Sequence, residues 1–309
     1  MNEWDAYYEE ATKRNIGLVS REEQSRLRRS CVAIAGMGGG GGLALTTLIR
    51  MGIGRFHIAD YDTFSVANTN RQVGAMSSTM DRAKVAVMAA MAEDIQPASQ
   101  VRTFPSGIGL HNIDDFLEGV DIVVDSLDIF AQPARKLLYE RARAKGIPVV
   151  FSAPPGFSAT IGVCTPDGMS FEDYFDLREG MTPFQIMAAF IVGLTPAGTH
   201  WSYSDMSCVE PGEQAAPSSA AALTLMTGIL ATEVLVILLR RRKPMALPRY
   251  AQFDPYKGVY RTGRLRWGNR GPLQRLKRWW IERKFREHAA TYNRAGFEPL
   301  PTADDADTD

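Results

Sequence analysis

Cysteine is scarce in this 309-residue chain, and neither sign of charge is in excess. The three cysteines, Cys31, Cys164 and Cys208, are too few for a disulfide framework and lack the paired C-x-x-C spacing of a zinc site. Thirty-five basic residues balance thirty-five acidic ones, so no overall field attracts nucleic acid or an anionic membrane. We therefore expect a reducing, cytoplasmic setting, and we expect no zinc, no nucleic-acid partner and no membrane contact.

The sequence also lacks a secretory signal, because its first fourteen residues, MNEWDAYYEEATKR, are polar and acidic. Residues 220–239, AAALTLMTGILATEVLVILL, are apolar over twenty positions and are followed by four basic residues, as in a membrane anchor. Three threonines, a glycine and Glu233 interrupt this run, and an ionised glutamate is costly in lipid. The sequence therefore favours a buried helix over a membrane span.

Helical and strand-like segments alternate over the first 155 residues. Ser20 and Glu23 have the spacing of a capping box, which predicts a helix over 21–29 within a polar N-terminal segment, 1–30. The predicted strands are 31–35, 56–59, 101–104, 121–125 and 148–152, and the later helices are 81–94 and 131–145. This alternation predicts an α/β, Rossmann-like, doubly wound and mostly parallel sheet over 31–155.

The second half of the chain is less regular. Residues 156–219 are rich in Gly, Pro, Ser and Met, and we expect strands and a long crossing loop there, with helix 220–239 packing back on the sheet. Residues 156–256 would then form a substrate-side, antiparallel and crossover region. Residues 257–309 form a basic, Trp-bearing extension with an acidic tail that we expect to be disordered. The extension could cover an acidic partner, lie on a membrane interface or pack on the sheet, which we favour.

A glycine-rich loop at 36–42 separates the first strand from the next helix. Glycine permits positive φ and lets backbone N–H groups approach a phosphate, and the helix N-terminus adds partial positive charge. Asp60 follows the second strand, twenty-four positions after Gly36, near the interval at which an acidic residue binds a nucleotide ribose. Such loops serve NAD, FAD and ATP alike, and a tight packing turn is the alternative.

Two cations and a carboxylate narrow the choice of nucleotide and of reaction. Arg71 and Lys84 follow the glycine loop in the sequence and are expected to flank it in the fold, where they could neutralise a triphosphate, although surface ion pairs would use the same residues. Asp125 and Asp128 follow the fourth strand at the ligand-binding edge of such sheets. Asp128 is a candidate Mg²⁺ ligand, and the alternative is that Asp125 or Asp128 caps the next helix.

Taken in order, these motifs resemble the ThiF/MoeB/HesA branch of the ubiquitin-activating superfamily over roughly residues 14–240. They are G-x-G-G-x-G from Gly36, D-Y-D-x-x-x-x-x-N-x-x-R-Q from Asp60, then Lys84 and Asp128. The resemblance implies ATP attacked at its α-phosphate by the C-terminal carboxylate of a ubiquitin-like protein or peptide, which gives an acyl-adenylate and pyrophosphate. It assigns the nucleotide loop to Gly36, Gly38, Gly39 and Gly41, the ribose to Asp60, phosphate contacts to Asn68, Arg71, Gln72 and Lys84, and Mg²⁺ to Asp128.

The resemblance also implies roles for Arg14 and Cys208. Arg14 matches an arginine that dimeric relatives lend to the neighbouring subunit, so we expect a homodimer with two-fold symmetry. Cys208, in S-C-V-E-P-G, resembles a crossover-loop cysteine that receives the acyl group or forms a sulfur-transfer disulfide, and a passive loop cysteine is the alternative. The zinc-binding C-x-x-C pairs of many relatives are absent, and the extension at 257–290 has no counterpart in the shortest ones.

The sequence thus predicts a Mg²⁺- and ATP-dependent adenylyltransferase whose substrate and final product are not specified. An NAD(P)-dependent oxidoreductase on the same fold is the second hypothesis, and a non-catalytic binding module that recruits a ubiquitin-like partner is the third. Adenylation could also lead to amide or ring formation on a peptide rather than to sulfur transfer. The charged positions Arg71, Lys84 and Asp128 favour the first hypothesis.

Overall fold

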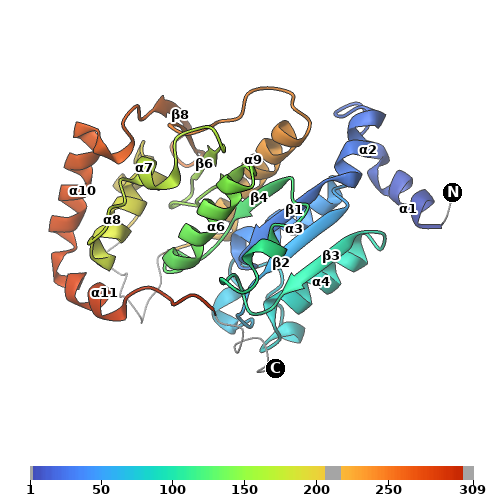
Figure 1. The fold of residues 1–309 in the computed structure, drawn as a ribbon, viewed down its shortest axis with the longest axis horizontal. Helices are drawn as coiled ribbons and strands as arrows, with labels where there is room; N and C mark the ends of the chain where they lie inside the picture. The colour runs from blue at the N-terminus through green and yellow to red at the C-terminus, as the bar shows by residue number, and fades with distance from the viewer. Residues whose placement is uncertain (1–2, 206–216, 302–309) are drawn as a thin grey trace.

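A computed structural model describes residues 3–205 and 217–301 and shows an α/β fold around one eight-stranded sheet (Figure 1). The strands are β1 Cys31–Ala35, β2 Arg55–Ala59, β3 Gln100–Phe104, β4 Ile122–Asp125, β5 Val149–Phe151, β6 Ala159–Cys164, β7 Arg249–Asp254 and β8 Val259–Arg264. Their order is β3-β2-β1-β4-β5-β6-β7-β8. Strands β1 to β5 pair in parallel, and β5 to β8 pair antiparallel, which confirms the predicted fold class.

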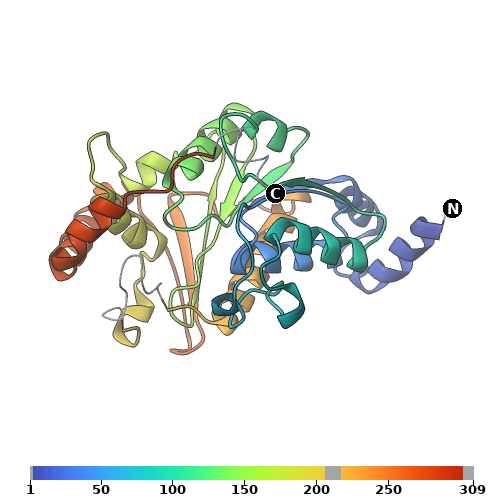
Figure 2. The same ribbon diagram turned by 90° about the horizontal axis from the view of Figure 1, so that it is seen from below.

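Helices cover both faces of the sheet (Figure 2). They are α1 Glu3–Thr12, α2 Arg21–Arg29, α3 Gly39–Arg50, α4 Lys84–Ile95, α5 Ile113–Phe116, α6 Gln132–Ala144, α7 Phe171–Phe175, α8 Pro183–Leu194, α9 Ala220–Leu238, α10 Pro272–Lys284 and α11 Ala289–Ala295. Helices α3, α4 and α9 share one apolar core, and α5, α6 and α7 share the other. Successive β1 side chains alternate between them: Val32 and Ile34 enter the first, Ala33 and Ala35 the second.

The N-terminal capping box forms as predicted. The Ser20 hydroxyl accepts from the Glu23 backbone N–H at 3.2 Å, and the Glu23 carboxylate accepts from the Ser20 N–H at 2.8 Å. Helix α2 therefore begins and ends at the expected residues and leads directly into β1.

The middle region contains more helix than the sequence indicated. Residues 156–219 were expected to hold strands and a crossing loop, but they contain β6, α7 and α8 among their described residues. Helix α8 starts in a capping box, Thr182 with Gln185, and has Pro183 in its first turn. Its sequence, PFQIMAAFIVGL, is apolar on nearly all sides, so it lacks the polar face by which an amphipathic helix is recognised.

Helix α9 is long and apolar enough, by length and composition, to cross a membrane, but half of its most apolar window is buried inside the protein. It packs against α3 and β6. The Glu233 carboxylate is buried, and it accepts hydrogen bonds from Arg242 Nη2 and from the Met245 backbone N–H, each at 2.6 Å. These contacts satisfy the charge near the helix end and favour the predicted core helix.

The basic extension adds β8 to the sheet edge and places α10 on α8. Asn269 of the extension is buried, and it donates hydrogen bonds to the carbonyls of Phe175 in α7, at 3.0 Å, and Ala189 in α8, at 2.7 Å. The Trp280 ring stacks on Trp201 with centroids 5.7 Å apart. The acidic end, from Asp304, lies outside the described residues.

A buried carboxylate joins α7 to this extension. Asp176 is 1% exposed, follows α7 in the left-handed region at φ 56°, and accepts hydrogen bonds from three arginines. Arg178 Nε lies 2.8 Å away, Arg270 Nε 3.2 Å and Arg278 Nη1 3.2 Å. Two of these arginines belong to the extension, so the contact couples segments about ninety residues apart in sequence.

Removing this charge should loosen the extension. Asp176→Asn keeps the side-chain size and the tolerance for left-handed backbone, and we expect it to lower the free energy of unfolding by about 1–3 kcal/mol. Urea denaturation measures the loss. Arg178→Gln is the matched control, because that arginine is 65% exposed and its ion pair should contribute little. Equal stability of Asp176→Asn and the unchanged protein would contradict the coupling.

Candidate nucleotide site

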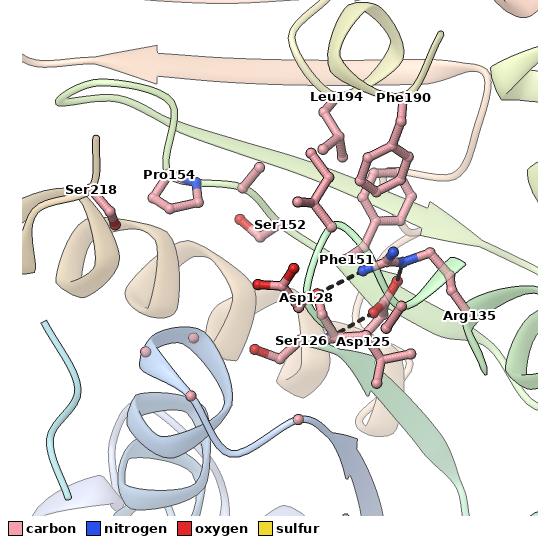
Figure 3. Close-up of a pocket in the computed structure, with 18 of the residues that line it drawn as sticks. Asp125, Ser126, Asp128, Arg135, Phe151, Ser152, Pro154, Phe190, Leu194 and Ser218 are labelled. Carbon is pink, nitrogen blue, oxygen red and sulfur yellow. Dashed lines mark hydrogen bonds and ion pairs between the residues drawn. The ribbon is translucent and has the colours of Figure 1, made fainter. Parts of the chain in front are cut away.

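A cavity of about 450 Å³ lies along the carboxyl ends of the parallel strands, where open α/β sheets bind ligands. Of the predicted site residues, Gly36, Gly38, Gly39, Asp60, Arg71, Gln72, Lys84 and Asp128 line it, whereas Gly41, Asn68 and Arg14 do not. Figure 3 shows the side of this cavity near β4 and β5. The structure therefore gathers residues from 36 to 128 at one edge of the sheet.

The glycine loop packs so tightly that side chains are excluded from two of its positions. A Cβ on Gly41 would lie 1.8 Å from the Gly36 carbonyl oxygen, and a Cβ on Gly36 would lie 2.4 Å from the Ser126 carbonyl oxygen. Gly36 also has a positive φ of 92°. The loop is thus both a packing turn between β1, α3 and β4 and a wall of the cavity, with the α3 N-terminus beginning at Gly39.

Asp60 holds this loop from the end of β2. Its Oδ2 accepts a hydrogen bond from the Met37 backbone N–H at 2.6 Å, and its Oδ1 accepts from the Asp62 N–H at 2.8 Å. Burial raises the pKa of the Asp60 carboxyl, and the nearby Lys84 ammonium acts in the opposite direction. The carboxylate therefore fixes the loop and borders the cavity at the position predicted for ribose recognition.

Both predicted cations reach the cavity, and both already have partners within the chain. Lys84 is buried at the start of α4, and its Nζ lies 2.7 Å from Asp62 Oδ2. Arg71 Nη1 donates to the Ala67 carbonyl and to Asn70 Oδ1, each at 2.9 Å. An incoming anion would therefore compete with one carboxylate and two neutral acceptors.

The neighbouring amides differ in placement. Gln72 is buried and lines the cavity, and its Oε1 has no hydrogen-bond partner in the part of the chain that the structure describes. Asn68 is half-buried and does not line the cavity, because its Oδ1 accepts from the Ser65 N–H at 3.1 Å and caps the turn Val66–Asn68. Gln72 is consequently the better placed of the two for a ligand.

The two aspartates after β4 have separate environments. Asp128 is exposed in the cavity, and its Oδ1 accepts from the Phe130 N–H at 3.0 Å in a local turn before α6. Asp125 is buried, and its Oδ2 accepts from Arg135 Nε at 2.8 Å and from the Tyr139 hydroxyl at 3.0 Å. Asp125 is thus neutralised within the core, whereas Asp128 keeps oxygen atoms available to a cation.

Arg14 and the two described cysteines, Cys31 and Cys164, lie apart from the cavity. Arg14 is exposed on a short 3-10 helix, Lys13–Asn15, between α1 and α2. Burial raises the pKa of the Cys31 thiol to about 11 and that of the Cys164 thiol well above its usual value, so both are core thiols. Cys208 lies outside the described residues. Across residues 3–205 and 217–301, His, Cys, Asp and Glu form no group of three or more suited to a metal ion.

No pattern in the sequence indicated that residues 298–301 would border the cavity. Glu298 Oε2 accepts from the Tyr61 hydroxyl at 2.6 Å, and Glu298 N donates to the Phe130 carbonyl at 3.3 Å. Pro301 lies beside Gly107, in the loop after β3. We call residues 298–301 the C-terminal strap. A contact between residues 237 positions apart has no local sequence pattern, so only the fold could show it.

His200 is a second residue that the sequence did not single out. It is 7% exposed, lines the cavity beyond the glycine loop, and has no hydrogen-bond partner for Nδ1 among the described residues. Burial lowers the pKa of His200 to about 4, although the Asp254 carboxylate opposes this. The imidazole is therefore neutral near pH 7.

Comparisons with known proteins identify the family of the chain. The family model described as ThiF family matches residues 12–270. The sulfur carrier protein adenylyltransferase of Thermus thermophilus is 30% identical over 161 residues, which cover 52% of this chain and 58% of that protein. The tRNA threonylcarbamoyladenosine dehydratase of Bacillus subtilis is 31% identical over 140 residues, which cover 45% of this chain and 54% of that protein. The chain thus spans little more than half the length of these relatives.

A solved structure extends the likeness in fold. The crystal structure of PaaA superimposes with a TM-score of 0.59 at 19% identity, over 85% of this chain and 72% of that one. At this level of identity the match concerns the fold alone.

The buried His200 predicts a pH-dependent stability. The pKa is about 4 in the folded protein and near 6.5 in the unfolded chain, so the unfolded chain binds the proton more readily. Keeping His200 unprotonated in the folded protein costs nothing above pH 6.5. As the pH falls, this cost lowers the free energy of unfolding, by about 3 kcal/mol below pH 4. We expect His200→Gln to lose less stability than the unchanged protein between pH 6.5 and 4, as measured by urea unfolding.

The exposed His111 provides the control for this experiment. His111→Gln should follow the unchanged protein at every pH, because the His111 ring keeps its contact with water in the folded protein. Parallel pH curves for His200→Gln and the unchanged protein would contradict the assigned burial cost.

Proposed function

Because the chain belongs to the ThiF family, we propose that it is a Mg²⁺-dependent adenylyltransferase that activates the C-terminal carboxylate of a ubiquitin-like protein or peptide. The observation that carries this proposal is the convergence of the glycine loop, Arg71, Lys84 and Asp128 on one cavity. One relative, a sulfur carrier protein adenylyltransferase, supports the reaction class. The activity of the whole protein rests on this proposal, since the relatives are matched over about half their length.

The proposed reaction is a displacement at phosphorus. A carboxylate oxygen attacks the α-phosphate of ATP, a new oxygen–phosphorus bond forms, and the bond between the α- and β-phosphates breaks. Pyrophosphate leaves with the electron pair, and the product is a mixed anhydride of the acid and AMP. Little proton transfer is required, so the protein has mainly to position the reactants and neutralise charge.

The residues present suit these tasks. Backbone N–H groups at the α3 N-terminus would bind phosphate oxygens, in a loop where added Cβ atoms collide with backbone. Arg71 and Lys84 would neutralise the triphosphate, and Asp60 would bind the ribose. Asp128 would hold Mg²⁺, which supplies charge neutralisation on the phosphates when bound.

An NAD(P)-dependent oxidoreductase is the less favoured function. A dinucleotide site of this fold needs the glycine loop and the ribose carboxylate but has little use for a second and third charged group beside the phosphates. Arg71 and Lys84 both line the cavity, and two cations there suit a triphosphate, which carries more negative charge than the pyrophosphate of a dinucleotide. The non-catalytic module is disfavoured for the same reason.

Three finer points belong to the proposal. Arg14 is exposed on its own chain and outside the cavity, as a residue lent to a two-fold partner would be. The proposed assembly is therefore a homodimer in the cytoplasm. Cys208 is the proposed acyl acceptor, and whether the final product is a thioester, a thiocarboxylate or an amide is left open by the proposal.

Lys84→Ala should weaken binding of Mg²⁺-ATP by roughly 10- to 100-fold, because a charge-assisted contact to phosphate is lost. Calorimetry with ATP and with NAD measures this. Lys136→Ala is the matched control, since that lysine is 65% exposed on α6 and outside the cavity. Asp62→Asn keeps Lys84 but removes its partner, and should not weaken ATP binding. Tight NAD binding without a response to ATP would overturn the proposal.

Asp128→Asn should slow ATP–pyrophosphate exchange by about 100-fold, because an amide is a poorer Mg²⁺ ligand than a carboxylate. The variant should remain folded by circular dichroism, since the asparagine oxygen can still accept the Phe130 N–H. Exchange at the rate of the unchanged protein would remove Asp128 from the site.

A further inference from the structure

The cavity continues past the nucleotide residues into a second, apolar part. Its apolar walls come from the end of β5, from α7 and from α8, and we call it the apolar lobe. Its residues are Phe151, Pro154, Phe171, Phe190, Ile191 and Leu194. Figure 3 shows Phe190 and Leu194 descending from α8 toward Phe151, with Asp128 between them and the glycine loop.

The lobe lies on the side of the cavity where an acyl group would enter. In the proposed orientation the ribose binds Asp60 at the end of β2, and the phosphates bind the glycine loop after β1. The base then points toward β3, where the C-terminal strap meets Tyr61 and Gly107. In the sheet order, β5 lies on the opposite side of β1, beyond the phosphates.

Polar groups around the lobe are largely occupied by one another. The Arg135 guanidinium lies under the Phe190 ring, 4.8 Å from its centroid, and donates to Asp125. The Ser152 hydroxyl donates to the Thr160 carbonyl. His200 is neutral near pH 7 because burial lowers its pKa. Arg135 Nη1 has no hydrogen-bond partner among the described residues, but the Asp125 carboxylate balances the charge of this guanidinium. A charged side chain entering the lobe would therefore lose its hydration without finding an unpaired opposite charge there, whereas an apolar one would fit.

We propose that the substrate residue bearing the activated carboxylate has a bulky apolar side chain, of the leucine or phenylalanine class, which binds in the apolar lobe. The inference rests on the proposed adenylation. A terminus ending in glycine would place no side chain against Ile191 and Leu194, which are partly exposed in the lobe. Burial of a leucine side chain between them should favour the leucine ligand about 10-fold or more over glycine.

Stable mimics of the acyl-adenylate test this without requiring turnover. The probes are N-acetyl-aminoacyl sulfamoyl adenosines carrying glycine, leucine, phenylalanine, lysine or aspartate, and their dissociation constants are measured by calorimetry on the full chain. We expect leucine and phenylalanine probes to bind about 10-fold or more tightly than glycine, and lysine and aspartate probes to bind no better than glycine. A glycine probe that binds as tightly as leucine would overturn the proposal.

Variants at Leu194 test whether the apolar lobe causes the preference for leucine and phenylalanine probes. Leu194→Ala should weaken the leucine probe and leave the glycine probe and ATP unchanged, and Leu194→Trp should fill the lobe and exclude leucine while glycine still binds. Leu194 is only partly buried at the end of α8, so both variants should fold. Leu225→Ala, which shortens the same side chain on α9 outside the cavity, is the control. An unchanged preference in both Leu194 variants would contradict the assignment.

The two proposals fail in different ways. If ATP binds but every probe binds equally, or none binds, the apolar lobe is not an acyl site and the nucleotide assignment stands. If neither ATP nor any probe binds, the proposed adenylation itself is wrong. If the lysine or aspartate probe bound most tightly, the lobe would be a site for a charged side chain, and the proposed apolar substrate residue would be wrong.

Discussion

The close approach of backbone to backbone at the glycine loop is the constraint on which the site depends. The loop lets α3 start directly above β1 because Gly41 faces the Gly36 carbonyl, and it lets β4 end beside β1 because Gly36 faces the Ser126 carbonyl. Any side chain at these positions would separate the three elements. Asp60 then fixes the loop through the Met37 N–H. The cavity exists because these contacts bring the ends of β1, β2 and β4 to one level.

The parallel half of the fold could be predicted because its signals are local. Strands β1 to β5 lie within one or two residues of the predicted ranges, and the Ser20 capping box defined α2 correctly. Asp60, Lys84 and Asp128 follow strand ends or begin a helix, so topology alone brings them to the same edge. Asn68 and Gly41 share the motif but serve the local backbone, and no pattern distinguishes the two uses.

The parts that the sequence did not indicate depend on contacts between distant segments. Helix α8 is apolar around its circumference because α7 and α10 enclose it, so it has no amphipathic period to detect. Asp176 binds Arg270 and Arg278 of the extension, and this pairing keeps α10 against α8. The position of Phe190 and Leu194 over the cavity is therefore set by a segment more than seventy residues further along the chain. The C-terminal strap depends in the same way on the fold.

The balance of charge in the cavity favours a nucleotide that arrives with a cation. Apart from the ion pair of Asp125 with Arg135, four carboxylates border it, Asp60, Asp62, Asp128 and Glu298, against the cations Arg71 and Lys84, and Lys84 is already paired with Asp62. Burial raises the pKa of Glu298, and the three aspartates raise it further, so these carboxylates repel one another. A triphosphate alone would add more negative charge to this rim. A divalent cation held by Asp128 would offset both sets of charge, which makes Mg²⁺ dependence an electrostatic consequence of the proposed binding mode.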